Sequence, residues 1–180
     1  MMKKSLIKQI AMIGAVVVGM LAFGGTTQAN ASSKEHFNSR TITYHIDSTS
    51  KHYKGIWKDA INEWNSKGVL KFKASSKKKA NLRLTTVFQL KHDYFYQTRA
   101  HGTLSERGYT RIVDLKLSRN FMDENNYTQN ERVNLATMGI ENSLGLDLSN
   151  DKQSHMYYSG EKSITSYDVS QLKKLYVHVK

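Results

Sequence analysis

Between Asn134 and Tyr157 the chain gathers residues that could bind a metal ion or transfer protons. A helical pattern there runs into the turn Leu144-Gly145-Leu146-Asp147, and the segment Ser154-His155-Met156-Tyr157 follows. Two carboxylates and an imidazole, those of Glu141, Asp147 and His155, lie in the same stretch. Zinc accepts such groups as ligands besides thiolate. Whether the protein is an enzyme therefore depends on how this stretch places its side chains.

The histidines do not form a helical metal-binding pair. Two histidines four residues apart lie on one helix face and can hold one ion. No two of the seven histidines have that spacing; they are His36, His45, His52, His92, His101, His155 and His178. Histidines scattered in this way are typical of surface or hydrogen-bonded positions.

Covalent mechanisms have no better support. The chain contains no cysteine and no G-x-S-x-G motif, so neither a cysteine nor a serine nucleophile is indicated. Asp47, Asp123 and Glu124 are further carboxylates, but nothing in the sequence pairs them as a glycosidase would require.

Alternating and helical patterns predict the elements around this stretch. Residues 40–47, 69–74, 81–88 and 109–117 alternate in the manner of strands. A helix is expected over residues 53–66 and should end near Gly68. Its apolar face consists of Trp57, Ala60, Ile61 and Trp64. Residues 89–103, rich in Tyr, Phe and His, follow no clear pattern.

The second half of the chain has clearer helix signals. Thr128 and Glu131 have the spacing of a capping box, which predicts a helix start. Gly145 suits the left-handed residue that ends this helix. Its inner face should carry Val133, Ala136, Ile140 and Leu144. A last helix is expected over residues 167–176, so the order of elements predicts one mixed α/β domain.

The first 31 residues have the features of a secretory signal peptide. Three lysines precede an apolar stretch over residues 10–25, and Ala29-Asn30-Ala31 resembles a cleavage site. The apolar stretch is short for a membrane span. We therefore expect a signal peptide over 1–31, a single domain over 32–180, and no stable membrane span after cleavage; retention as an anchor is the alternative. Secretion without cysteines is typical of bacterial export.

The chain is strongly basic, with a formal net charge of +12, or about +9 without the signal peptide. One basic cluster extends from Lys71 through residues 77–79 to Arg83. Such a cluster could hold the protein near anionic cell-wall polymers or membrane lipids, or it could be a solvated loop that favours solubility. No nucleic-acid partner is expected, because an exported chain without a binding motif offers no basis for one.

The chain resembles the matrixin branch of the metzincin peptidases, in its compact bacterial form. Four segments carry the resemblance: Ala60-Ile61-Asn62-Glu63-Trp64-Asn65, Asn81-Leu82-Arg83-Leu84, the helix with its Leu144–Asp147 turn and Met156-Tyr157, and Ser166-Tyr167-Asp168-Val169 with Leu172 and Leu175-Tyr176. The resemblance implies a zincin-like α/β fold. Its sheet would have about five mostly parallel strands, with three helices and a cleft beneath an edge strand.

The same resemblance assigns roles to individual positions. In the metzincin pattern H-E-x-x-H-x-x-G-x-x-H, followed by a Met-turn, the glycine falls on Gly145 and the Met-turn methionine on Met156. The three histidines then fall on Met138, Asn142 and Leu148, and the general-base glutamate falls on Gly139. A thioether, a neutral amide and an aliphatic group should not hold zinc, and glycine cannot accept a proton.

Other ligands do not repair this pattern. Glu141 lies about 200° around the helix from position 139, so we expect its side chain to point elsewhere. His92 and His101 could correspond to the structural-metal loop of larger matrixins, but the partners that such a loop needs are missing.

The sequence therefore favours a secreted, matrixin-like pseudopeptidase without zinc-dependent proteolysis and without a cofactor. Its partner would be an extended peptide or an extracellular protein, held in a groove floored by Met138, Asn142, Met156 and Tyr157. Two alternatives remain: an active secreted zinc metalloendopeptidase with an atypical metal site, and a basic protein associated with the cell wall.

Overall fold

A single five-stranded sheet organises the protein. The computed structural model describes residues 36–179 except 106–107, 148, 150 and 157–162, so the predicted signal peptide lies outside the described residues. The strands are β1 (Thr41–Asp47), β2 (Lys71–Ala74), β3 (Leu82–Val87), β4 (Tyr96–Ser105) and β5 (Gly108–Ser118). Their order is β2-β1-β3-β5-β4, and β4 alone is antiparallel to its neighbour. The predicted α/β fold with a mostly parallel sheet of five strands is confirmed.

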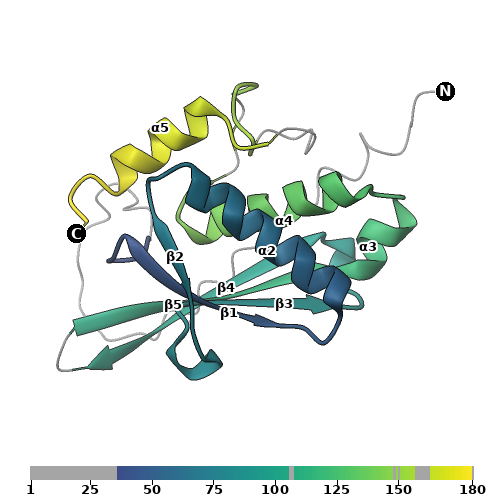
Figure 1. Cartoon of the computed structure of the whole chain (residues 1–180), viewed down its shortest axis with the longest axis horizontal. Coiled ribbons are helices and arrows are strands. Elements are labelled where there is room, and N and C mark those ends of the chain that lie inside the picture. Colours follow the sequence, from purple (N-terminus) through teal and green to yellow (C-terminus); the bar gives the residue numbers. More distant parts are fainter. Residues whose placement is uncertain (1–35, 106–107, 148, 150, 157–162, 180) are drawn as a thin grey trace.

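The helices lie on one side of this sheet (Figure 1). They are α2 (Lys51–Ser66), α3 (Arg119–Glu124), α4 (Gln129–Ser143) and α5 (Ser166–Leu175), with short 3-10 turns η1 (Lys77–Lys79) and η2 (Lys91–Asp93). The prediction of three helices was wrong by one, because it missed the six-residue α3. Among the described residues, no helix is long and apolar enough to cross a membrane.

The predicted apolar face of α2 is buried in the core. Trp57, Ala60, Ile61 and Trp64 are all buried. Each indole also finds a hydrogen-bond acceptor: Trp57 Nε1 donates to Thr86 Oγ1 of β3 at 3.0 Å, and Trp64 Nε1 donates to the Thr137 carbonyl of α4 at 3.3 Å. Since a buried indole N–H needs a partner, these bonds fix α2 against both the sheet and α4.

The helix α4 begins and ends as predicted. The capping box is present: the Thr128 side chain accepts from the Glu131 N–H, and Glu131 Oε2 accepts from the Thr128 N–H. At the other end, Gly145 has a φ of +99°. The Gly145 N–H donates to Asn142 O and the Leu146 N–H to Glu141 O, which is the Schellman pattern.

The helix α4 is buried over more of its circumference than the sequence suggested. The predicted inner residues Ala136, Ile140 and Leu144 are buried and Val133 is partly buried. The intervening residues are buried too, without a break from Leu135 to Glu141. The helix contacts α2, β4 and β5, so little of its surface remains for solvent.

Candidate functional site

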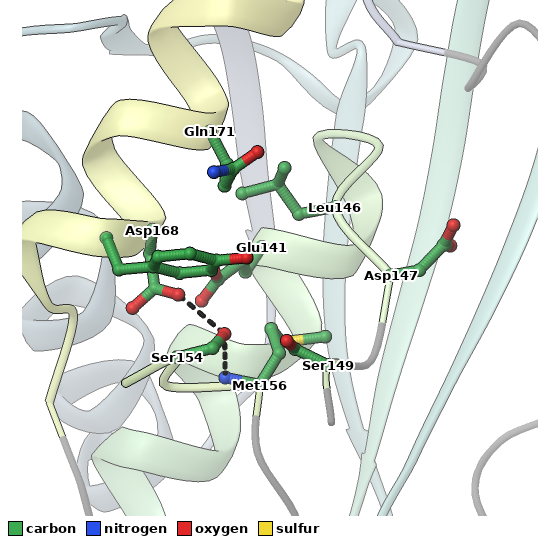
Figure 2. Close-up of a pocket in the computed structure, with 9 residues that line it drawn as sticks. Glu141, Leu146, Asp147, Ser149, Ser154, Met156, Asp168 and Gln171 are labelled. Atoms are coloured by element: carbon green, nitrogen blue, oxygen red, sulfur yellow. Dashed lines mark hydrogen bonds between the residues drawn. The ribbon is translucent and has the colours of Figure 1, made fainter. Parts of the chain in front are cut away.

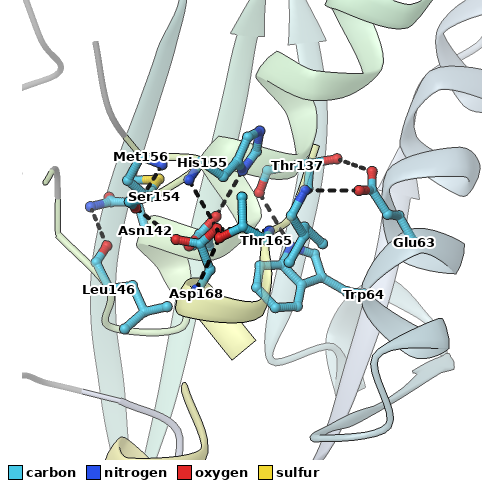
Figure 3. Close-up of polar contacts among 12 residues, drawn as sticks. Glu63, Trp64, Thr137, Asn142, Leu146, Ser154, His155, Met156, Thr165 and Asp168 are labelled. Carbon is cyan, nitrogen blue, oxygen red and sulfur yellow. Dashed lines mark hydrogen bonds and ion pairs between the residues drawn. The ribbon is translucent and has the colours of Figure 1, made fainter. Parts of the chain in front are cut away.

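The segment after α4 and the start of α5 meet the last turns of α4 (Figure 3). This is where the resemblance places a catalytic centre. Of the predicted positions, Leu148 and Tyr157 lie outside the described residues. Met138, Gly139, Asn142, Gly145 and Met156 are described, and each has a definite environment.

Asn142 connects the helix to the edge strand. Its Oδ1 accepts a hydrogen bond from Thr98 Oγ1 of β4 at 2.9 Å, and its Nδ2 donates to the Leu146 carbonyl at 3.4 Å. The amide is therefore engaged on both sides. We infer that Asn142 holds the turn after α4 against β4.

Position 139, which the resemblance assigns to the general base, has no room for a side chain because β5 lies against it. A Cβ built on Gly139 would lie 2.8 Å from Leu115 Cδ1 and 3.2 Å from Cδ2. Leu115 is fully buried on β5. The glycine thus lets α4 approach the sheet closely, and a side chain at this position would have to displace Leu115.

The residues at the assigned ligand positions do not fit zinc. Met138 is 3% exposed and offers only a thioether, and the Asn142 amide is already hydrogen bonded. Elsewhere in the described part of the chain, no three His, Cys, Asp or Glu side chains come close enough together to hold an ion. Zinc requires several strong N, S or O donors, so no catalytic step can be derived through such an ion here.

A buried pair of titratable groups lies at the centre of this region. His155 Nδ1 is 2.8 Å from Glu141 Oε2, and neither side chain is exposed to solvent. Glu141 therefore faces a different neighbour from Gly139, which faces Leu115. Glu141 Oε1 is buried without a hydrogen-bond partner among the described residues. An unpaired charged oxygen is costly in such a place.

Burial determines the ionisation of this pair. It raises the pKa of Glu141 well above its usual range, and the carboxylates of Asp168 and Glu63 raise it further. Burial also lowers the pKa of His155 to about 4, although the same two carboxylates oppose this shift. Both shifts favour the neutral forms. We infer that near neutral pH the two side chains share one proton in a neutral hydrogen bond.

Asp168 holds the segment before Met156 in place. Its Oδ1 accepts from Ser154 Oγ at 2.6 Å, and its Oδ2 accepts from the His155 N–H at 2.9 Å. The same Oδ2 accepts the N–H and hydroxyl of Thr165, the residue that caps α5. With four donors, this buried carboxylate is satisfied. Its role is to join α5 to the segment 154–156.

The carboxylate of Glu63 links α2 to α4 and to the residues just before α5. Glu63 Oε1 accepts from the Ile164 N–H at 3.1 Å, and Oε2 accepts from Thr137 Oγ1 at 3.4 Å (Figure 3). Ile164 immediately precedes the cap of α5. The polar network therefore runs from α2 through α4 to α5.

A small pocket of about 100 Å³ opens beside the network (Figure 2). Its walls include Glu141, Asp147, Ser149, Met156, Asp168 and Gln171. Ligand pockets for organic molecules usually hold roughly 300–1,000 Å³. The pocket is therefore too small for such a molecule, and Glu141 and Asp168 in its wall are already hydrogen bonded.

Met156 and Met138, which were predicted as parts of a groove floor, are 1% and 3% exposed. They could support a groove only from beneath. His92 and His101, which were considered as a possible structural-metal loop, have separate neighbours: the His92 ring lies 5.8 Å from the Tyr94 ring at an angle of 54°, and His101 Nδ1 lies 3.6 Å from Asp114 Oδ2.

Sequence reasoning treated Glu141 and His155 only as possible metal ligands and Asp168 only as part of a family segment, and it missed the buried contacts that join the three residues. Glu141 and His155 are 14 positions apart, as are Ser154 and Asp168. No local spacing rule relates residues at that separation. The one available signal was that charged and polar residues interrupt otherwise apolar segments, which indicates buried polar groups that must find partners.

The sequence matches no known protein-family model, and no curated protein is significantly similar to it. The fold and site therefore define a class and no more: an α/β domain with a mixed, mostly parallel five-stranded sheet. A buried polar network around Glu141, His155 and Asp168 lies in this domain where the resemblance would place catalytic groups.

Proposed function

We propose that the protein is a secreted, matrixin-like pseudopeptidase that binds an extended peptide along β4 without cleaving it. The observation that carries this proposal is the position of β4. It is an antiparallel edge strand of ten residues, and among the described residues its backbone pairs with β5 alone. An exposed strand edge can accept a further strand through main-chain hydrogen bonds.

The surroundings of β4 support this assignment. The Thr98–Asn142 hydrogen bond fixes the strand to α4, and Tyr96 is buried beneath it. The edge is therefore held in a defined position before any peptide arrives. A preorganised edge reduces the entropy lost on binding, which favours a binding role for this strand.

The other sheet edge differs. β2 has four residues and carries Lys71 and Lys73, both exposed. Short edge strands with lysines resist the addition of another strand. This contrast supports β4 as the strand that would bind the peptide, and β2 serves as an internal control.

Amide hydrogen exchange tests the proposal. The purified protein would be mixed with reduced, carboxymethylated α-lactalbumin, which is permanently unfolded. We expect slower exchange over residues 96–105, unchanged exchange over residues 71–74, and an intact α-lactalbumin with or without a chelator. Absence of protection in β4, or cleavage that a chelator stops, would contradict the proposal.

The zinc content of the purified protein distinguishes this proposal from the alternative, an active metallopeptidase with an atypical site. Protein purified without chelator should contain well under one zinc per chain; a value of about one would favour the alternative, since structural and catalytic zinc is tightly bound.

A gain-of-binding variant tests the matrixin resemblance itself. Met138→His, Asn142→His and Leu148→His would supply three imidazoles at the assigned positions, while Gly139 is kept because Leu115 leaves no room there. We expect the triple variant to bind zinc. A folded variant that binds none, with an unchanged circular dichroism spectrum, would show that the alignment of these positions is wrong.

A further inference from the structure

The sheet face opposite the helices carries two ordered rows of polar side chains. Strand register places residues from β1, β3, β5 and β4 side by side in each row. The first row is His45, Arg83, Asp114 and Arg99; the second is Asp47, Thr85, Lys116 and Gln97. With Lys77 of η1, most of them line a shallow depression of about 480 Å³.

The positive charges on this face outnumber the negative ones. Asp47 pairs with Lys77, and Asp114 lies 3.9 Å from Arg83 and 3.6 Å from His101. Both carboxylates therefore already have partners. Arg99 and Lys116 are exposed and have no ion pair within the described part of the chain. They are available to an anion from solution.

The basic surface continues to the opposite edge of the sheet. Phe72 of β2 is buried in the core, so Lys71 and Lys73, which flank it, point to the other face. Neighbouring strands lie about 4.8 Å apart. Basic side chains thus extend over roughly 19 Å from β2 to β4. This width suits an elongated polymer better than a single small anion.

The face lacks the features that single-stranded nucleic acids and protein partners usually need. Single-stranded nucleic acids bind through aromatic platforms on which bases stack. No Phe, Tyr or Trp points to this face from the strand segments 41–47, 71–73, 83–87, 97–101 and 112–116. Protein partners usually require a buried aromatic or aliphatic centre, and the two rows are polar throughout.

We propose that this open face binds a linear, ring-free polyanion whose charges are phosphodiester groups, such as a poly(glycerol phosphate) chain of the cell surface. Arg99 and Lys116 lie on adjacent strands and are offset by one row. Together they can donate to the two non-bridging oxygens of one phosphodiester. The surface differs from the unpaired β4 edge, so this inference does not depend on peptide binding there.

Binding to purified poly(glycerol phosphate), followed by fluorescence anisotropy, tests the inference. The variant R99Q/K116Q removes the two available charges, both at exposed positions. We expect it to weaken binding about tenfold or more, with an unchanged urea midpoint. The matched control K54Q/K58Q removes the same net charge from exposed positions of α2, on the helix side of the sheet, and should change binding less than about twofold.

Each arm of the experiment can overturn the inference. Equal loss in the two variants would show attraction by net charge without a site, and no loss in either would remove the site. Tighter binding of a single-stranded oligothymidylate would assign the face to nucleic acid. Equal or tighter binding of polyglutamate would contradict recognition of phosphodiesters. None of these results bears on hydrogen exchange in β4, so the two proposals fail separately.

Discussion

The two faces of the sheet are built from alternate residues of the same strands, yet they have opposite chemistry. On β5, Leu115 is fully buried against α4, and Lys116 projects to the opposite, exposed face. Side chains alternate between faces along a strand, so each strand contributes to both. One face gains its free energy from apolar burial, while the other leaves its charges in water. The stability of this protein and its capacity to bind anions are therefore expected to be separable by mutation.

The sharpest test of this separation uses two adjacent residues. Leu115→Ala should lower the free energy of unfolding by about 2–5 kcal/mol, because it leaves a cavity between the sheet and α4. Lys116→Ala should change it by no more than about 0.5 kcal/mol, because the side chain is exposed and unpaired. Urea denaturation measures both. Similar losses in the two variants would show that the faces are not independent.

The effect of Gly139→Ala on the free energy of unfolding tests the contact between α4 and Leu115, because its sign should depend on the residue at position 115. Alanine in place of a helical glycine normally stabilises by about 1 kcal/mol, but overpacking costs about 1–3 kcal/mol. With Leu115 Cδ1 only 2.8 Å from the new Cβ, we expect Gly139→Ala to destabilise by about 1 kcal/mol. In the Leu115→Ala background the same change should stabilise, since the space is vacant. Additive effects would contradict the proposed close contact.

The buried Glu141–His155 pair gives the apolar side a dependence on pH. Because the pKa of Glu141 is raised in the folded state, the folded protein retains a proton that the unfolded chain loses above about pH 4.5. The contribution of Glu141 to stability is therefore fully present below that pH and falls as the pH rises toward the pKa of Glu141 in the folded protein. Glu141→Gln keeps a neutral donor and cannot ionise. The stability of this variant relative to the wild type should therefore increase from pH 5 to pH 8. Urea midpoints measured at each pH test this.

The opposite trend would show that Glu141 is ionised in the folded protein. His155 provides a partial check, since its pKa is lowered to about 4. In the wild type it should cost stability only as the pH falls below about 6.5 toward 4.

The smallest expected effect concerns the charged face. Asp114 lies between Arg83 and Arg99 in the first row and pairs weakly with Arg83 and His101. Asp114→Asn should alter the free energy of unfolding by less than about 1 kcal/mol, because partly exposed ion pairs contribute little. It should strengthen poly(glycerol phosphate) binding a few-fold by freeing Arg83. Weaker binding would mean that Asp114 positions the arginines and does not compete for them.

Local patterns predicted the elements well where the relevant signal was local. The Thr128–Glu131 capping box, the apolar face of α2 and the glycine turns at Gly68 and Gly145 depend on residues a few positions apart, and the structure confirms them. β4 was missed because its aromatic and polar residues gave no clear pattern. Its strand form depends on pairing with β5, which supplies the partner that the sequence did not reveal.

The site was less accessible to sequence reasoning. Met138, Gly139 and Asn142 could be read as residues that do not suit zinc, because that conclusion needs only their side-chain chemistry. The environments they occupy depend on distant residues: Leu115 closes position 139, and Thr98 engages Asn142. The two rows on the open face likewise arise from register between four strands, which no single segment encodes.

The contacts of the last helical turn have a consequence for the order of folding. The Tyr176 hydroxyl accepts a hydrogen bond from the Phe37 N–H and donates one to the Leu144 carbonyl, and Arg40 donates to the carbonyls of Tyr176 and Val179. Some of these bonds span 139 positions of the chain. A chain that emerges from a narrow channel with its N-terminus first cannot form them until residue 176 has passed through. The contacts of Phe37 and Arg40 with residues 176 and 179 are therefore late events in folding, whereas β1 itself can pair with β2 much earlier.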